Sequence, residues 1–302
     1  MAESGSPASV SIVDSHQHVW DLSVRAQPFL ETSDALAPLR RTVSIGELVP
    51  VARAVGVTAT VIVQTVTERG ETPELMALAS AEPLVAAVVG WTDLTSPAVA
   101  DALAELRAMP GGRHLAGIRH PLLTEPRADW IVTPEVRRGL AAVAAAGLTF
   151  DLVLAPHQLP TAVEAAAQVP ELMFVLDHLG NVEPAAVVDA EWASAFSALA
   201  TLPNATCKLS GMLSEPAPVY LADRNGEASV AHLRPYFDLA LDRFGPDRLM
   251  FGSDWPLCTL SSTYGQVVAA AMTLTSELAE PERAAIMGGT AQSVYRIGDR
   301  CA

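Results

Sequence analysis

The sequence predicts a single α/β domain in which eight parallel strands alternate with helices and close into a barrel. Three observations support this prediction. Strand-like runs begin at residues 12, 59, 84, 115, 149, 172, 205 and 249, and a helical pattern or an excursion follows each. No stretch rich in glycine and serine divides the 302 residues. No glycine-rich phosphate-binding turn follows the first run, so an open doubly wound sheet is the less favoured alternative.

The first run starts at Ile12 and ends in the pair His16 and His18. Side chains two apart in an extended chain point to the same face, so both imidazoles are expected to project together. Residues 1–11 are small and polar and lack the basic start and apolar centre of a signal peptide. They are expected to form a flexible tail ahead of a barrel domain over residues 12–302.

The chain between the first two runs combines an excursion with a helix. Residues 20–41 are polar, and Pro28 and Pro38 prevent a long helix, so this segment is expected to fold over the barrel mouth or to cross the surface. A helix is predicted from the N-cap Ser44, with Glu47 three residues later. Residues 59–64 are rich in β-branched side chains, which is typical of a strand buried on both faces.

The rest of the chain repeats this alternation. Strands are predicted at residues 84–90, 115–119, 149–154, 172–176, 205–209 and 249–252. Helices are predicted at residues 73–80, 97–108, 134–146, 160–169, 190–200 and 233–244, with two more before the end of the chain.

Composition and charge exclude several classes of partner. The net charge of −15 and the pI near 4.8 disfavour nucleic acid and anionic membranes. The sequence contains no run of about 18 apolar residues that would predict a membrane span. Three cysteines without metal-site spacing predict no structural disulfide and a cytoplasmic location. The expected partner is a small-molecule substrate, and a homo-oligomer remains open.

Polar residues gather where the predicted strands end. In a parallel barrel these ends meet at one mouth, where catalytic groups collect. The residues at or just beyond the ends are His16, His18, Gln64, Trp91, Arg119, His120, His157, His178, Lys208 and Asp254.

Neutral imidazoles and one carboxylate form a typical zinc set with an open position for water. The predicted ligands of one divalent metal, with zinc preferred, are His16, His18, His157 and Asp254. Zinc would lower the pKa of bound water towards ~7, and Asp254 would accept its proton as a general base. His178 is predicted to donate a hydrogen bond to a substrate carbonyl or to carry a proton; the alternative is a histidine satisfied by backbone.

Two basic residues lie at the predicted mouth. Arg119 and Lys208 suit a substrate carbonyl, a developing oxyanion or a carboxylate product. The alternative for each is an ion pair with Asp151, Asp177 or Glu215. Because Arg119 ends the fourth strand and cannot bridge two metals, one metal at most is expected.

Three tryptophans flank the same strand ends. Trp20, Trp91 and Trp255 are candidates for the walls of a sugar-sized pocket, and packing in the core or rim is the alternative. Cys207 and Cys258 are expected to be small buried hydrophobes rather than nucleophiles. No G-x-S-x-G elbow occurs, so a serine hydrolase is poorly supported.

Several stretches resemble a known family. They are DSHQHVWD, VVGWTDL, LAGIRH, FDLVLAPHQLP, FVLDHLGN, CKLSG and DRLMFGSDWPLC, and they run from residue 12 to about residue 270. They resemble the amidohydrolase superfamily, and more narrowly its lactonase branch, which includes L-fuconolactonase and L-rhamnonolactonase. The resemblance implies a distorted TIM (β/α)8 barrel of the amidohydrolase type that hydrolyses a small sugar-type lactone to its hydroxy acid.

The same resemblance implies roles for five residues. His16 and His18 correspond to the first-strand pair, His157 and His178 to the fifth- and sixth-strand histidines, and Asp254 to the aspartate that activates water. The branch includes metal-optional members, so these residues could also act without a metal. Three competing functions stay open for the same barrel: decarboxylation of an aromatic acid, hydrolysis of a carboxylated aromatic-pathway lactone, and binding of a metal or ligand without catalysis.

Overall fold

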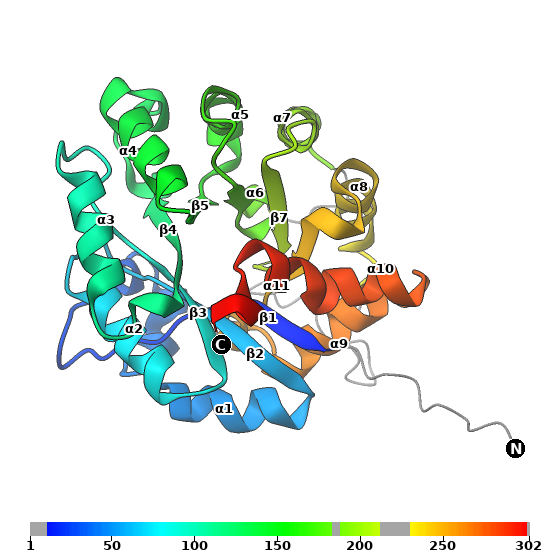
Figure 1. Cartoon of the computed structure of the whole chain (residues 1–302). Helices are drawn as coiled ribbons and strands as arrows, with labels where there is room; N and C mark the ends of the chain where they lie inside the picture. The colour runs from blue at the N-terminus through cyan, green and yellow to red at the C-terminus, as the bar shows by residue number, and fades with distance from the viewer. Residues whose placement is uncertain (1–10, 183–187, 212–229, 301–302) are drawn as a thin grey trace, which may run out of the picture.

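The computed structural model describes residues 11–182, 188–211 and 230–300. Within these ranges eight parallel strands form one sheet in the order β1 to β8, so each strand pairs with the next one along the chain. The strands are β1 Ile12–Gln17, β2 Val57–Val63, β3 Val85–Gly90, β4 Leu115–Pro121, β5 Thr149–Val153, β6 Phe174–Leu176, β7 Ala205–Leu209 and β8 Leu249–Phe251. This arrangement confirms the predicted α/β barrel (Figure 1).

The barrel closes just beyond β8 rather than through a regular β8–β1 ladder. Gln17 and Trp255 form a parallel bridge, and the His18 amide donates a hydrogen bond to the Trp255 carbonyl at 2.7 Å. The pairings β1–β2, β2–β3 and β3–β4 contain register shifts. The barrel is therefore distorted on the side where the first strands lie.

Helices surround the sheet (Figure 1). They are α1 Ile45–Ala54, α2 Glu71–Ala81, α3 Val99–Ala108, α4 Pro134–Ala145, α5 Leu159–Gln168, α6 His178–Asn181, α7 Ala190–Ala200, α8 Arg234–Phe244, α9 Tyr264–Leu274, α10 Glu280–Ala284, α11 Thr290–Val294 and α12 Ile297–Arg300, with a π-helix, η9, at Ala285–Gly289. Short 3-10 turns are η1 Pro28–Glu31, η2 Asp34–Leu39, η3 Gly112–His114, η4 Leu122–Thr124, η5 Trp130–Val132, η6 Pro156–Gln158, η7 Pro246–Arg248 and η8 Leu257–Leu260.

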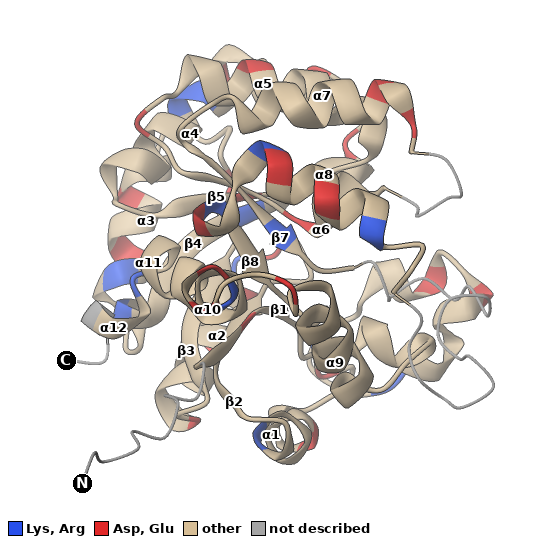
Figure 2. Ribbon diagram, turned by 90° about the vertical axis from the view of Figure 1, so that its right-hand side faces the viewer, with Lys and Arg blue, Asp and Glu red and all other residues tan. Residues whose placement is uncertain are grey.

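Local sequence explains these elements. The Ser44 amide donates to the Glu47 side chain at 3.0 Å in the capping box that begins α1. The proline-interrupted segment forms η1 and η2 instead of a long helix. Acidic residues lie on the outer helices, among them α5 and α7 (Figure 2). None of the described helices has the length and apolar character that crossing a membrane requires.

The core has two parts. The larger part lies between the sheet and the helices, and the smaller part fills the barrel interior with residues such as Val61, Val89 and Met250. Tyr295 from the C-terminal segment is fully buried in this inner cluster. Gly288 of the preceding η9 approaches the Ser11 carbonyl beside the start of β1. The C-terminal segment thus covers the end where the strands start and leaves the opposite end for the site.

Candidate active site

Two of the predicted catalytic residues lie on left-handed backbone. His178 (φ 54°) opens α6 directly after β6, and Asp254 (φ 56°) follows β8. Positive φ is uncommon for residues other than glycine and is maintained by surrounding contacts, often at functional sites. The Asp254 amide donates to the His16 carbonyl at 2.9 Å, which fixes the turn after β8 against the end of β1.

A buried carboxylate beneath the site also joins β1 to the chain after β8. Asp14 accepts hydrogen bonds from the Ser253 amide at 2.8 Å, the Ser253 hydroxyl at 2.6 Å and the Tyr264 hydroxyl at 3.0 Å. Burial raises the pKa of Asp14 to about 6, although these hydrogen bonds oppose the rise. The contacts hold Ser253, and with it the adjacent Asp254, in a fixed position.

The side chains of His16, His18 and Asp254 converge at the barrel mouth. The two Nε2 atoms are 3.0 Å apart, and Asp254 Oδ1 lies 3.8 Å from His16 Nε2 and 3.6 Å from His18 Nε2. All three residues are buried. These separations suit ligands bound at about 2.0–2.2 Å to one zinc ion, so the three residues fit a divalent metal.

Polar contacts at the far side of each imidazole fix its orientation. His18 Nδ1 lies 2.8 Å from the Val63 carbonyl, which can only accept, so the proton is on Nδ1 and the Nε2 lone pair faces the cluster. His16 Nδ1 lies 3.3 Å from Asp177 Oδ1 and 3.2 Å from Lys208 Nζ. The His18 Nε2 lone pair thus points toward His16 and Asp254, an arrangement that a cation stabilises.

Burial favours the neutral form of His16 and His178, and neighbouring imidazoles favour the ionised form of Asp254. Burial lowers the pKa of His16 well below 6.5 despite the nearby Asp177 carboxylate. Burial also lowers the pKa of His178, against the attraction of Asp254. For Asp254, burial alone would raise the pKa, but His178, His18 and His16 together outweigh it and hold the pKa below its ordinary value. The site thus combines two imidazoles of lowered pKa, His16 and His178, with an ionised carboxylate.

Lys208 lies beneath the cluster in a charge network. Its Nζ is fully buried and lies 2.6 Å from Asp151 Oδ2, 2.9 Å from Asp177 Oδ1 and 3.2 Å from His16 Nδ1. The Tyr295 hydroxyl donates to Asp151 at 2.7 Å. Lys208 does not line the cavity described below, so the geometry favours the ion-pair alternative over substrate binding. The other proposed partner, Glu215, lies outside the described residues.

The same ammonium bears on how many metals fit. His16, Asp177 and His178 form a second group whose ligand atoms could share a cation. The Lys208 contacts with Asp177 and His16 place a positive charge at that group already. A cation at this second group would have to compete with that ammonium.

Arg119 is both paired and close to the mouth. Its Nη1 lies 3.1 Å from Asp177 Oδ2 and 3.3 Å from His16 Nε2, and Nη2 donates to the Gln64 carbonyl. The guanidinium is 7% exposed and contributes to the cavity lining. Its Nε has no hydrogen-bond partner among the described residues.

His157 is not brought to the cluster. It lies in η6, which Pro156 begins directly after β5, and its side chain is exposed. It belongs to neither group of candidate ligands among the described residues. The structure therefore does not place His157 among the candidate metal ligands.

The three tryptophans pack around the site instead of lining its cavity. Trp20 Nε1 donates to the Arg41 carbonyl at 2.7 Å, and its ring packs edge-on against Phe29. Trp91 Nε1 donates to His120 Nδ1 at 3.1 Å. Trp255 is buried in the main core. In this structure Trp20, Trp91 and Trp255 therefore pack in the core or rim and do not form the walls of the cavity.

A cavity of about 740 Å³ opens above the cluster. Its base contains His18, Asp254, His178 and Arg119. Hydroxyl and amide side chains among its described lining are Thr32, Ser33, Thr65, Thr67, Thr124 and Asn181, and apolar ones include Phe29, Leu36, Leu123, Leu257 and Leu260. The η1–η2 segment supplies several of these residues, so the excursion predicted at residues 20–41 does fold over the mouth.

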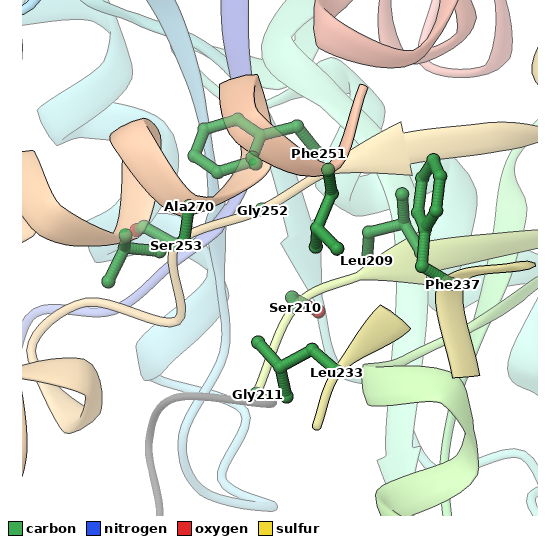
Figure 3. Close-up of a pocket in the computed structure, with 12 residues that line it drawn as sticks. Leu209, Ser210, Gly211, Leu233, Phe237, Phe251, Gly252, Ser253 and Ala270 are labelled. Carbon is green, nitrogen blue, oxygen red and sulfur yellow. The ribbon is translucent and has the colours of Figure 1, made fainter. Parts of the chain in front are cut away.

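A second, mostly apolar cavity lies behind the site between β7, β8, α8 and α9. Leu209, Leu233, Phe237 and Phe251 surround it, with Ser210 at its edge (Figure 3). Its volume is about 30 Å³, which leaves room for about one or two water molecules. It is too small for a substrate.

Ser210 and Gly211 set the position of His178. The Ser210 hydroxyl lies 2.9 Å from His178 Nδ1. Gly211 has φ +73°, and a Cβ there would lie 2.7 Å from the His178 side chain. No sequence pattern singled out either residue for this role.

We expect Gly211→Ala to displace His178 and to lower kcat at least tenfold, while left-handed strain costs about 1–2 kcal/mol of stability. Gly56→Ala is the matched control, because Gly56 has φ +81° but a Cβ there would meet nothing within 4 Å. It should lose similar stability in urea unfolding and keep native kcat. Equal kcat values for both variants would contradict the assigned contact.

One feature of the sequence points to the buried Lys208–Asp151–Asp177 network independently of the strand ends. Lys208 is the only lysine in the chain. Every other Lys/Arg position in the chain is arginine. Lys208 is fully buried, and its compact ammonium fits between the carboxylates of Asp151 and Asp177.

Comparisons with known proteins agree with this geometry. A family model described as amidohydrolase matches residues 13–297. An L-fucono-1,5-lactonase of Burkholderia multivorans is 37% identical over 295 residues, covering 94% of this chain and 96% of that protein. Another L-fucono-1,5-lactonase, from Burkholderia ambifaria, is 33% identical over 290 residues, covering 94% of this chain and 95% of that protein.

Solved structures give the same result. The crystal structure of an amidohydrolase from Burkholderia multivorans with bound zinc has a TM-score of 0.82 and 36% identity, covering 95% of this chain and 99% of that chain. The family match spans β1 from Val13 onward, all of β2 to β8, and His16, His18 and Asp254. The chain belongs to the amidohydrolase family.

Proposed function

We propose that this protein is a lactonase that opens a small, uncharged sugar-type lactone to its hydroxy acid, using water activated at His16, His18 and Asp254. The observation that carries the proposal is the convergence of two imidazole Nε2 atoms and one carboxylate oxygen at the base of a cavity. The choice of a lactone as substrate is based on the two Burkholderia relatives, both named L-fucono-1,5-lactonase.

Asp254, Arg119 and His178 have different roles in the proposed hydrolysis. Asp254 holds an ionised carboxylate at the cavity base and accepts the proton of the attacking water. Arg119 contributes to the cavity base, where its fixed positive charge stabilises the negative charge that develops on the substrate carbonyl oxygen. When Ser210 donates to His178 Nδ1, the His178 Nε2 proton is available to the substrate. A zinc ion held by His16, His18 and Asp254 would supply Lewis acidity and lower the pKa of bound water.

The lining favours an uncharged substrate over a carboxylated one. Arg119 is the only lysine or arginine among the described lining residues, and its Nη atoms already contact Asp177, His16 and Gln64. Hydroxyl and amide groups of the lining suit the hydroxyls of a sugar lactone. A carboxylated lactone or an aromatic acid would need further positive partners.

A pH-indicator assay on the purified protein tests the proposal. Acid release is expected from sugar 1,5-lactones, with L-fucono-1,5-lactone tested first, and little is expected from carboxylated lactones. Carbon dioxide release from aromatic acids is measured in parallel. Carbon dioxide release without acid release from any lactone would replace the lactonase with a decarboxylase, and metal binding with neither product would indicate a binding protein.

We expect the acid limb of kcat/KM to lie below pH 6.5. The active form needs neutral imidazoles, and burial lowers the pKa of His16 and of His178 from 6.5. As the pH falls, His16 and His178 therefore stay neutral until the pH is below 6.5, the ordinary pKa of histidine. Activity falls only when these imidazoles take up protons. A pH–rate profile with native protein measures this limb. A limb above pH 6.5 would contradict the burial argument.

A further inference from the structure

We infer that Arg119 is a resident cation that weakens metal binding at His16, His18 and Asp254. The inference rests on the proposed assignment of those three residues as the metal site. It assigns Arg119 control of metal affinity in addition to any contact with substrate.

The first observation is direct competition for a ligand atom. Arg119 Nη1 lies 3.3 Å from His16 Nε2, the same atom that faces His18 and Asp254. A guanidinium can only donate, so in this contact the His16 Nε2 lone pair accepts the hydrogen bond. A metal ion needs that lone pair, so it must displace the Arg119 hydrogen bond.

The second observation is the charge balance. Lys208 pairs with Asp151 at 2.6 Å, and Arg119 pairs with Asp177 at 3.1 Å. Asp254 forms its ion pairs with imidazoles alone among the described residues. The cluster thus offers one uncompensated carboxylate charge to a divalent ion. Without the positive charge of Arg119, the negative charge of Asp177 would no longer be fully neutralised. The charges of Asp254 and Asp177 together would then balance the two positive charges of the metal ion.

The third observation is that Arg119 is held in place. Asp177 and the Gln64 carbonyl bind its two terminal nitrogens, and the side chain is almost wholly buried. A fixed, desolvated charge repels a nearby cation more strongly than a mobile, hydrated one. The guanidinium therefore acts on the metal as a permanent part of the site.

Zinc affinity of the metal-stripped protein tests this inference, measured by competition with a chromophoric chelator at neutral pH. Arg119→Met should lower the zinc dissociation constant at least tenfold. A tenfold change corresponds to about 1.4 kcal/mol. Arg119→Lys keeps the positive charge, so its zinc dissociation constant should stay within about threefold of the native value. Arg53→Met, at an exposed pair with Glu82, is the control for loss of a positive charge elsewhere.

A second variant guards against misfolding. Arg119→Gly should also bind zinc more tightly, and low-millimolar guanidinium should reverse the gain by filling the vacated position, while the native protein should not respond. Thermal unfolding without metal shows whether each variant folds. Zinc affinity equal to native or weaker in folded Arg119→Met and Arg119→Gly, or no reversal by guanidinium, would overturn the inference.

These results are separable from the proposed function. Tighter zinc binding in Arg119→Met, with no lactone hydrolysis by the native protein, would support the inference and reject the lactonase. Lactone hydrolysis by the native protein, with unchanged zinc affinity in the variants, would reject the inference alone.

Discussion

Asp254→Asn should lower kcat by about two to four orders of magnitude, which is the usual contribution of a general base. An amide cannot accept the proton of water, and it is a weaker ligand for a cation that His16 and His18 share. The fold should remain, because the Asp254 backbone amide, which bonds the His16 carbonyl, is unchanged. Initial rates on a lactone that the native protein hydrolyses provide the measurement.

Two controls make this result specific. Asp129→Asn removes an exposed carboxylate paired with Arg127 and should leave kcat unchanged. Thermal unfolding of Asp254→Asn should stay close to that of the native protein. A folded Asp254→Asn variant with near-native kcat would show that this carboxylate does not activate water.

Lys208→Met should destabilise the fold by about 3–5 kcal/mol, the usual cost of removing one partner from a buried ion pair. Asp151 and Asp177 are both fully buried and would lose their ammonium partner. Burial already raises the pKa of Asp151, while Lys208, His16 and Arg119 outweigh burial at Asp177 and lower its pKa. Urea unfolding at neutral pH measures the loss of free energy.

The double variant Lys208→Met with Asp151→Asn is the matched comparison. It removes a charge of each sign, so it should be more stable than Lys208→Met alone. A loss of less than about 1 kcal/mol for Lys208→Met, the range of surface pairs, would contradict the buried network.

The fold could be predicted because buried parallel strands have a strong local pattern. The run at residues 149–154 corresponds to β5 Thr149–Val153, and the run at residues 172–176 to the shorter β6 Phe174–Leu176. The capping box at Ser44 and Glu47 is equally local. Each of these features depends on neighbours in sequence, so periodicity and turn residues suffice to find them.

Side-chain direction after a strand could not be predicted in the same way. His157 and His178 each follow a strand closely, yet His178 enters the mouth and His157 is exposed. After β6 the chain forms a left-handed turn through Gly180 and Asn181, whereas Pro156 begins η6 after β5. A difference of a few backbone angles decides which imidazole reaches the cluster.

The partners of the basic residues depend on packing between strands distant in sequence. Arg119 and Lys208 lie on β4 and β7, and both contact Asp177, which follows β6. The sequence identified the ion-pair alternative but could not select it over substrate binding. That choice depends on which side chains reach the same layer of the barrel interior.

Hydrolysis of a lactone in ¹⁸O-labelled water tests the central claim most directly. The native protein should place one ¹⁸O atom in the carboxylate of the hydroxy acid, at a rate far above the spontaneous reaction, and Asp254→Asn should slow this labelling by about two to four orders of magnitude. Label in the product hydroxyl, or labelling by Asp254→Asn as fast as by the native protein, would contradict attack on the carbonyl by water that this site activates.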